Sequence, residues 1–178
     1  MVLLGCTPKG RVTEQHDVFF GIGTQLKDLI PNMKAFWTEG IDLHIDAWRE
    51  ISVVDGFSVE VVEKAAEASD ENNLYFLNLG GYREDEFEEF HYKMLSVSAN
   101  ITTAIKKSKK TAFYKHSGFK GADSHIDEKY GIDVDDMHKV GDLLSAEDRL
   151  KYKLKFSELA QPHEEDKLHL GYLIFKKL

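Results

Sequence analysis

Short runs of hydrophobic residues, several of them alternating with polar ones, recur along the chain and predict β-strands. In the first third of the sequence strands are expected at 2–4, 16–20, 43–47 and 56–62, and further on at 74–79 and 92–97. Gly5 and Gly80 each follow one of these strands. Because glycine tolerates positive φ, a sharp exit from the strand is expected at both places.

The spacing of apolar residues changes to three and four after the second strand of each set, which predicts an amphipathic helix there. Thr24 is the expected N-cap of the first helix and Asn100 that of the second. Pro31 lies inside the first stretch and lacks a backbone N–H. We therefore expect either a kink at Pro31 or a short first helix with Pro31 opening the next one.

Parts of the sequence occur twice. The repeated segments are Leu4-Gly5 with Leu79-Gly80, Glu14-Gln15-His16 with Glu89-Phe90-His91, and His44-Ile45-Asp46 with His125-Ile126-Asp127. At the same offset as the last pair, Ile51, Val53, Asp55 and Val59 have the partners Ile132, Val134, Asp136 and Val140. Such a repeat predicts a duplicated structural unit whose shared apolar positions hold a shared fold.

The order of these elements predicts an α+β protein built of two tandem strand–strand–helix–strand–strand repeats, a β-grasp-like order, with a C-terminal β extension. The expected parts are repeat unit 1 over 1–63, repeat unit 2 over 74–143 and C-terminal strands over 150–178, within a single pseudo-symmetric domain spanning 1–178. The terminal strands, at 152–159 and 168–175, have no counterpart between the repeats. We expect them to cap or pair an exposed sheet edge.

Composition narrows the class of protein. Hydrophobic residues make up 42% and charged residues 30% of the chain, which is typical of a globular protein. The net charge of -8 argues against nucleic-acid binding, which needs clustered cations. No apolar run approaches the ~20 residues that span a bilayer. Cys6 is the only cysteine, so an intramolecular disulfide and a thiolate metal cluster are excluded, and a cytoplasmic location is expected.

Histidines and carboxylates in the repeated segments are the candidate chemical groups. Glu14 and His16 are two residues apart, as are His44 and Asp46, and on a strand each pair projects from one face. The repeat supplies a second set: Glu89, His91, His125 and Asp127. Imidazole and carboxylate together suit a divalent metal such as zinc or manganese. We favour the alternative, a hydrogen-bonded network that holds the fold, because duplication would preserve such a network in both units.

Strand order bears on which of these groups could meet. In a β-grasp unit the second and third strands lie on opposite sides of the sheet, so the Glu-x-His and His-x-Asp pairs of one unit are expected to be far apart. A metal site would then form across the two units, for instance from Glu14 and His16 with His125 and Asp127.

Two further motifs have simpler interpretations. Gly21-Ile22-Gly23 enters a helix and could cradle an anion, but it lacks the third glycine of a dinucleotide fingerprint, so a tight turn is expected. Cys6 directly follows a buried strand, and we expect it to pack against other residues and not to act as a nucleophile.

Four segments together resemble a known family. They read Glu-x-His-Asp-Val, His-Ile-Asp, Leu-Tyr-Phe-Leu-Asn-Leu-Gly-Gly-Tyr and Phe-Glu-Glu-Phe-His-Tyr-Lys. The combination resembles a bacterial family of uncharacterised proteins catalogued as domain of unknown function 1543, over residues 2 to about 145. The resemblance implies a duplicated α+β domain. It supplies no activity, cofactor or catalytic residue.

The sequence contains no nucleophile motif, phosphate loop or complete metal motif, so it favours a non-catalytic binding or interaction protein. The alternative is a small divalent-metal-dependent hydrolase with His and carboxylate residues at the repeat interface. For either function, the expected partner of the protein is a small molecule or another protein, which could be a second copy of the chain. Nucleic acid and membranes are not expected partners. No cofactor is assigned beyond the candidate zinc or manganese.

Overall fold

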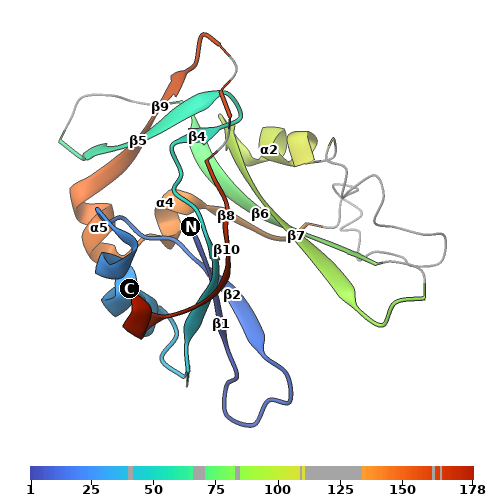
Figure 1. Cartoon of the computed structure of the whole chain (residues 1–178). Coiled ribbons are helices and arrows are strands. Elements are labelled where there is room, and N and C mark those ends of the chain that lie inside the picture. Colours follow the sequence, from blue (N-terminus) through green and yellow to red (C-terminus); the bar gives the residue numbers. More distant parts are fainter. Residues whose placement is uncertain are drawn as a thin grey trace. The chain divides into compact units, whose positions relative to one another are not determined.

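The computed structural model describes residues 1–39, 42–65, 71–82, 85–108, 110, 134–161, 163, 164 and 166–178. The chain divides into two compact units (Figure 1). The first comprises Met1–Ala66 together with Leu143–Leu178, and the second comprises Glu67–Asp142. Within the described residues, no helix is long and apolar enough to cross a membrane.

A four-stranded antiparallel sheet forms the centre of the first unit. Its strands, in spatial order, are β10 (His169–Ile174), β3 (His44–Trp48), β1 (Val2–Cys6) and β2 (Gln15–Phe19). The predicted α+β class is confirmed. The last predicted strand pairs with β3 as β10, so the expectation that the tail pairs a sheet edge is also confirmed.

A separate three-stranded sheet completes the strands of this unit. It consists of β4 (Val53–Val54), β5 (Phe57–Glu63) and β9 (Tyr152–Glu158), with β5 in the middle. Asp55 and Gly56, both with positive φ, form the tight turn between β4 and β5. The β-grasp-like arrangement is not confirmed, because β5 pairs with β9 and does not join the sheet that contains β1.

The helical stretch of the first unit has two parts, η1 (Leu26–Leu29) and α1 (Ile30–Phe36), with Pro31 in the first turn of α1. Proline fits this position because its missing N–H has no partner within the helix there. The prediction of a short first helix with Pro31 opening the next is therefore confirmed. The N-cap is Gln25 and not Thr24, whose hydroxyl instead donates to the Asp28 side chain at 2.7 Å.

The core of the first unit lies between the four-stranded sheet and these helices. Its buried members are Val2, Leu4, Phe19, Leu29, Met33 and Ile45. Two shorter helices of this unit are α5 (Ala146–Lys151), which precedes β9, and η2 (Phe175–Lys177), which follows β10. The helix α4 (Val140–Leu143) includes the position where the chain passes from the second unit to the first. Ser145 caps α5, since its hydroxyl oxygen accepts from the Asp148 N–H at 3.0 Å.

Met33 gives a test of this core, because its side chain is completely buried in α1. We expect Met33→Ala to lower the free energy of unfolding by about 2–5 kcal/mol, through lost apolar burial and the cavity left behind. Met33→Leu, which nearly conserves volume, should cost less than about 1.5 kcal/mol. Urea unfolding of both variants measures this difference, and equal losses would contradict it.

Asp166 connects the segment before β10 to the start of β4. Its carboxylate accepts from the backbone N–H groups of Ser52 at 2.6 Å and Val53 at 3.0 Å, and from the Ser52 hydroxyl. Burial raises the pKa of Asp166, but these hydrogen bonds and the nearby Arg49 charge outweigh it, so the pKa lies below its ordinary value. The ionised form is therefore the one that stabilises the fold.

We expect Asp166→Asn to lower the free energy of unfolding by on the order of 1 kcal/mol at pH 7, because the side chain is partly solvated and hydrogen bonds of this kind contribute modestly. A depressed folded-state pKa contributes stability above the unfolded-state pKa, and this is lost as pH falls through the folded-state value. The difference in free energy of unfolding between Asp166→Asn and wild type should thus become smaller below about pH 4. Urea unfolding at pH 7 and pH 3 measures this difference, and a difference that grows in acid would contradict the assignment.

The second unit contains a three-stranded antiparallel sheet and one helix. The strands are β7 (Glu89–Ser98), β6 (Asn73–Tyr82) and β8 (Val134–Lys139), with β6 in the middle, and the helix is α2 (Ile101–Ser108). Asn100 caps α2 as predicted, since its side-chain oxygen accepts from the Thr103 N–H at 3.0 Å. The buried core of this unit is Tyr75, Leu77, Leu79, Ala104 and Ile105.

The two units share one pairing pattern. Gly5 lies opposite His16 across β1 and β2, and Gly80 lies opposite His91 across β6 and β7. The third strands also correspond: β3 pairs with β1 and β8 pairs with β6, each with a register shift just before Leu4 or Leu79.

The repeat that relates His44-Ile45-Asp46 to His125-Ile126-Asp127, and Val53 to Val134, does not agree with the strand pairing. Val134 pairs with Leu79 as Ile45 pairs with Leu4, so the backbone counterpart of Ile45 is Val134. The predicted partner of Val134, Val53, lies in β4 in a different sheet. The equivalence drawn between Val53 and Val134 is therefore wrong, because similar short segments do not reveal which strand they pair with. The proposed counterparts His125 and Asp127 lie outside the described residues.

Candidate functional site

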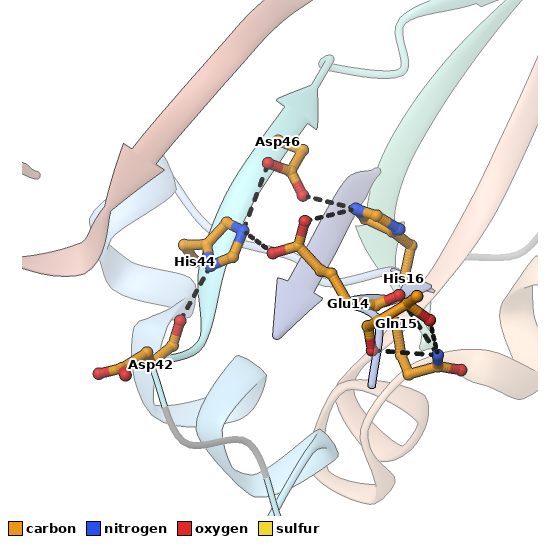
Figure 2. A network of polar contacts seen from close by, with 7 residues as sticks. Glu14, Gln15, His16, Asp42, His44 and Asp46 are labelled. Atoms are coloured by element: carbon orange, nitrogen blue, oxygen red, sulfur yellow. Dashed lines mark hydrogen bonds and ion pairs between the residues drawn. The ribbon is translucent and has the colours of Figure 1, made fainter. Parts of the chain in front are cut away.

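Three neighbouring strands bring the candidate residues of the first unit into one row. Gly5 in β1 lies opposite His16 in β2 on one side and opposite His44 in β3 on the other. Glu14 is the residue before β2 begins, and Asp46 lies two residues after His44 in β3. Side chains two residues apart on a strand project from the same face, so all four polar side chains gather on one side of the sheet (Figure 2).

The four side chains form what we call the His–carboxylate ring: Glu14, His16, His44 and Asp46. His16 Nε2 lies 3.5 Å from Glu14 Oε2 and 3.3 Å from Asp46 Oδ2. His44 Nε2 lies 2.9 Å from Glu14 Oε1 and 3.4 Å from Asp46 Oδ1. Each carboxylate therefore contacts both imidazoles, one oxygen to each, as Figure 2 shows.

The ring corrects the expectation that the two pairs of one unit lie far apart. The strand order was anticipated, since β2 and β3 do lie on opposite sides of β1. Two strand spacings amount to only about 10 Å, however, and histidine and glutamate side chains can span that distance together. The pairs meet because Gly5, the residue between them, has no side chain. The candidate site belongs to the first unit, and no residue of the second unit is needed to form it.

Gly5 is required by the geometry of the ring. A Cβ at this position would lie 2.4 Å from Asp46 Oδ2 and 2.7 Å from His44 Nε2, both inside van der Waals contact. The absence of a side chain therefore lets two ring members occupy the space above β1. The predicted strand exit at Gly5 is wrong, because Gly5 lies within β1 and does not have a positive φ. Its position opposite a histidine recurs at Gly80.

His44 is the most enclosed member of the ring, with only 6% of its side chain exposed. Its ring lies on the face of the sheet opposite the buried Ile45, yet it is covered. Tyr172 of β10 lies against it, with ring centroids 4.4 Å apart. Gly171, with a φ of 126°, lies at a register shift in β10 beside Tyr172.

The orientation of the His44 ring is fixed by its other nitrogen. Nδ1 lies 2.9 Å from the carbonyl oxygen of Asp42. A carbonyl oxygen can only accept, so Nδ1 carries the proton and donates it. In the neutral imidazole this leaves Nε2 with a free lone pair facing Glu14 and Asp46. Metal-binding histidines are commonly oriented in this way.

Two buried atoms of the ring have no hydrogen-bond partner: His44 Nε2 and Asp46 Oδ2. Both nevertheless have close neighbours, for His44 Nε2 is 2.9 Å from Glu14 Oε1 and Asp46 Oδ2 is 3.3 Å from His16 Nε2. These contacts are close but do not have the geometry of hydrogen bonds, so both atoms remain without a hydrogen bond. Buried polar atoms left unsatisfied are costly and call for an explanation.

The ring is not a ready-made metal site. Among the residues with described positions, no group of three or more His, Cys, Asp and Glu side chains has the arrangement needed to hold an ion. The contacts run around a ring and do not meet at one point. Glu14 and His16 have 43% and 42% of their side chains exposed, so these two are the ring members least covered by other residues.

Cys6 lies next to the ring in sequence but does not join it. The residue is buried, in agreement with the predicted packing role. Burial, and secondarily the charge of Glu14, raise the pKa of the Cys6 thiol. The thiol therefore stays protonated at neutral pH and is a poor metal ligand or nucleophile.

The second predicted set is only partly described. Glu89 and His91 lie in β7, where His91 is exposed opposite Gly80. Their predicted companions His125 and Asp127 fall outside the described part of the chain. The structure thus brings four of the eight candidates together. Sequence reasoning missed the contributions of Gly5, Asp42 and Tyr172, of which only Gly5 carried a signal through its repetition as Gly80.

A family model matches part of the chain. The family model described as Domain of Unknown Function (DUF1543) matches residues 11–61. The predicted resemblance to DUF1543 is confirmed over this stretch, which contains all four members of the ring. No curated protein matches the chain.

A solved structure shares the fold. The crystal structure of a protein Il1583 from Idiomarina loihiensis aligns with a TM-score of 0.58 at 21% sequence identity. The alignment covers 98% of this chain and 94% of that one. At this identity the likeness shows the fold alone.

Proposed function

We propose that the protein is a non-catalytic binding protein whose ligand at the His–carboxylate ring is one divalent metal ion, zinc in the first place. One observation supports this most directly. His44 Nε2 is buried between two carboxylates, has its lone pair exposed to them by the Nδ1 contact with Asp42, and has no hydrogen-bond partner. A cation between these groups would satisfy the nitrogen and the carboxylates together.

The ring atoms would reach the spacing of a zinc site once each carboxylate turned a single oxygen toward both histidines, because each histidine now contacts a different oxygen of each carboxylate. Around a tetrahedral zinc ion with bonds of about 2.0–2.2 Å, neighbouring ligand atoms lie about 3.4 Å apart. Three of the four nitrogen–oxygen contacts in the ring are 3.3–3.5 Å, and the fourth, from His44 to Glu14, is 2.9 Å. Rotation of the exposed Glu14 side chain would bring this last distance toward the others.

Charge and ligand type favour zinc over manganese. With neutral imidazoles the ring carries two negative charges, which a divalent cation would balance. Two nitrogen and two oxygen donors in a four-membered set suit zinc, whereas manganese prefers a larger, oxygen-rich coordination sphere.

The competing interpretation is a purely structural network of protonated histidines and carboxylates. That network would require His44 Nε2–H to point at a carboxylate oxygen. The ring does not provide this geometry at His44 Nε2. The network would also be insensitive to metal, which gives a direct test.

The test uses the whole chain without a histidine tag, dialysed against EDTA and then against metal-free buffer. We expect calorimetric titration with zinc to show one ion bound per chain, with weaker binding of manganese. Bound zinc should raise the melting temperature, because a ligand that binds only the folded state stabilises it by about 2.7 kcal/mol at one hundred times its Kd. No heat of binding and no change in melting temperature with zinc would overturn the proposal in favour of the structural network.

A further inference from the structure

We infer that Glu14 is the displaceable member of the ring and that the site takes a small monocarboxylate with an apolar or aromatic body in its place. The inference rests on the proposed metal site. It goes beyond that proposal because it names the second ligand of the site and the residues that would recognise it.

The four ring residues are held to very different degrees. His44 and Asp46 lie within β3, a strand paired on both sides, and their side chains are 6% and 24% exposed. His16 is more exposed but lies in β2, paired with Gly5 of β1. Glu14 alone lies outside a strand, one residue before β2, with 43% of its side chain in solvent. Its backbone and side chain are therefore the easiest of the four to move.

Without Glu14 the ring keeps two histidines and one carboxylate: His16, His44 and Asp46. Two-histidine, one-carboxylate sets are known to hold a divalent metal while leaving coordination positions open to other ligands. The set that remains is therefore a sufficient metal site with room for an exogenous donor.

Glu14 itself indicates the chemistry of that donor. Its two oxygens contact both histidines, at 3.5 Å to His16 and 2.9 Å to His44. This position accommodates a carboxylate straddling the two imidazoles, so a carboxylate from another molecule would fit the same place. Glu14 then acts as an internal competitor that the external ligand must displace.

Tyr172 provides a surface for the rest of the ligand. Its ring lies against His44 and 66% of the residue is exposed, so one side of the aromatic ring is available beside the site. An exposed aromatic group adjacent to a polar site is suited to pack against an apolar or aromatic body. Benzoate combines such a body with a carboxylate, and acetate provides the carboxylate alone.

The experiment uses cobalt(II) in place of zinc, because its visible absorption reports changes in the ligands bound to it. Wild type, Glu14→Ala and a control with an exposed glutamate outside the ring, Glu164→Ala, are each loaded with one equivalent. They are then titrated with benzoate, acetate and inorganic phosphate. Metal stoichiometry is measured first, in the absence of any carboxylate.

We expect Glu14→Ala to retain one cobalt per chain and to bind benzoate at least about tenfold more tightly than wild type or Glu164→Ala, because an internal competitor that is bound most of the time lowers apparent affinity by that factor. Tyr172→Ala should weaken benzoate binding and leave acetate binding unchanged. Loss of cobalt from Glu14→Ala, equal benzoate affinity with and without Glu14, or a preference for phosphate would each overturn this inference.

The two proposals can fail separately. If wild type takes up no cobalt or zinc, the proposed metal site itself is wrong. If wild type and Glu14→Ala both bind the metal but neither spectrum responds to benzoate, the metal site stands and the displaceable ligand is wrong.

Discussion

Replacement of His44 by alanine is expected to weaken zinc binding by at least about 100-fold, or about 2.7 kcal/mol. His44 contributes the buried nitrogen that has no hydrogen-bond partner, and its ring is already oriented by Asp42. Loss of this ligand removes both a metal bond and its preset direction, so the effect should exceed that of losing a more exposed ligand. Calorimetric titration of the metal-free variant with zinc measures the change.

The control for His44→Ala is His163→Ala, which removes an exposed histidine whose Nδ1 lies 2.8 Å from the Gln161 carbonyl oxygen. It should bind zinc as wild type does. If His44→Ala does not fold, His16→Ala replaces it, because His16 is half-exposed and its loss leaves no buried cavity. Melting in EDTA separates the two interpretations: a structural network predicts a large loss of stability without metal, whereas the metal site predicts that most of the loss appears only with zinc present.

Gly5→Ala is expected to weaken zinc binding although it changes none of the four proposed ligands. The new Cβ would lie 2.4 Å from Asp46 Oδ2 and 2.7 Å from His44 Nε2, so both side chains must move away. We expect at least a tenfold loss of affinity, about 1.4 kcal/mol, and a fold penalty of about 1–3 kcal/mol from overpacking. Zinc titration and urea unfolding measure the two effects.

Gly141→Ala is the matched control for Gly5→Ala, since a Cβ at Gly141 meets no heavy atom within 4 Å. It should leave zinc affinity unchanged. Wild-type affinity in Gly5→Ala would show that His44 and Asp46 can leave this space without consequence, and that the ring does not act as one site.

Much of the local structure follows from sequence alone, because strands, helices and caps depend on neighbouring residues. The alternation in 43–47 and the apolar run in 2–4 gave β3 and β1. Asn100 capped its helix as expected, and Pro31 fell in the first turn of α1 because only there is a missing N–H without cost. Thr24 missed its predicted role by one residue, which is the usual uncertainty at helix ends.

Pairing between distant strands was harder to predict. At the offset that relates Gly5 to Gly80, β1 and β2 pair in the same register as β6 and β7. The repeat that relates Val53 to Val134 gave a wrong equivalence, because the similarity of these two segments does not determine which strand each one pairs with. Which strand pairs with which depends on the packing of the whole unit. Val134 therefore lies in β8, which pairs with β6 as the third strand of the second unit.

The sequence by itself identified Glu14, His16, His44 and Asp46 as the chemically informative residues of the first unit, since their types and two-residue spacing require no coordinates. Tertiary structure alone decided that they form one ring. Antiparallel pairing places β2 and β3 on either side of a glycine, whose missing side chain leaves room for four polar groups to meet. It also enclosed His44 beneath Tyr172, and burial makes the absence of a hydrogen-bond partner at His44 Nε2 costly.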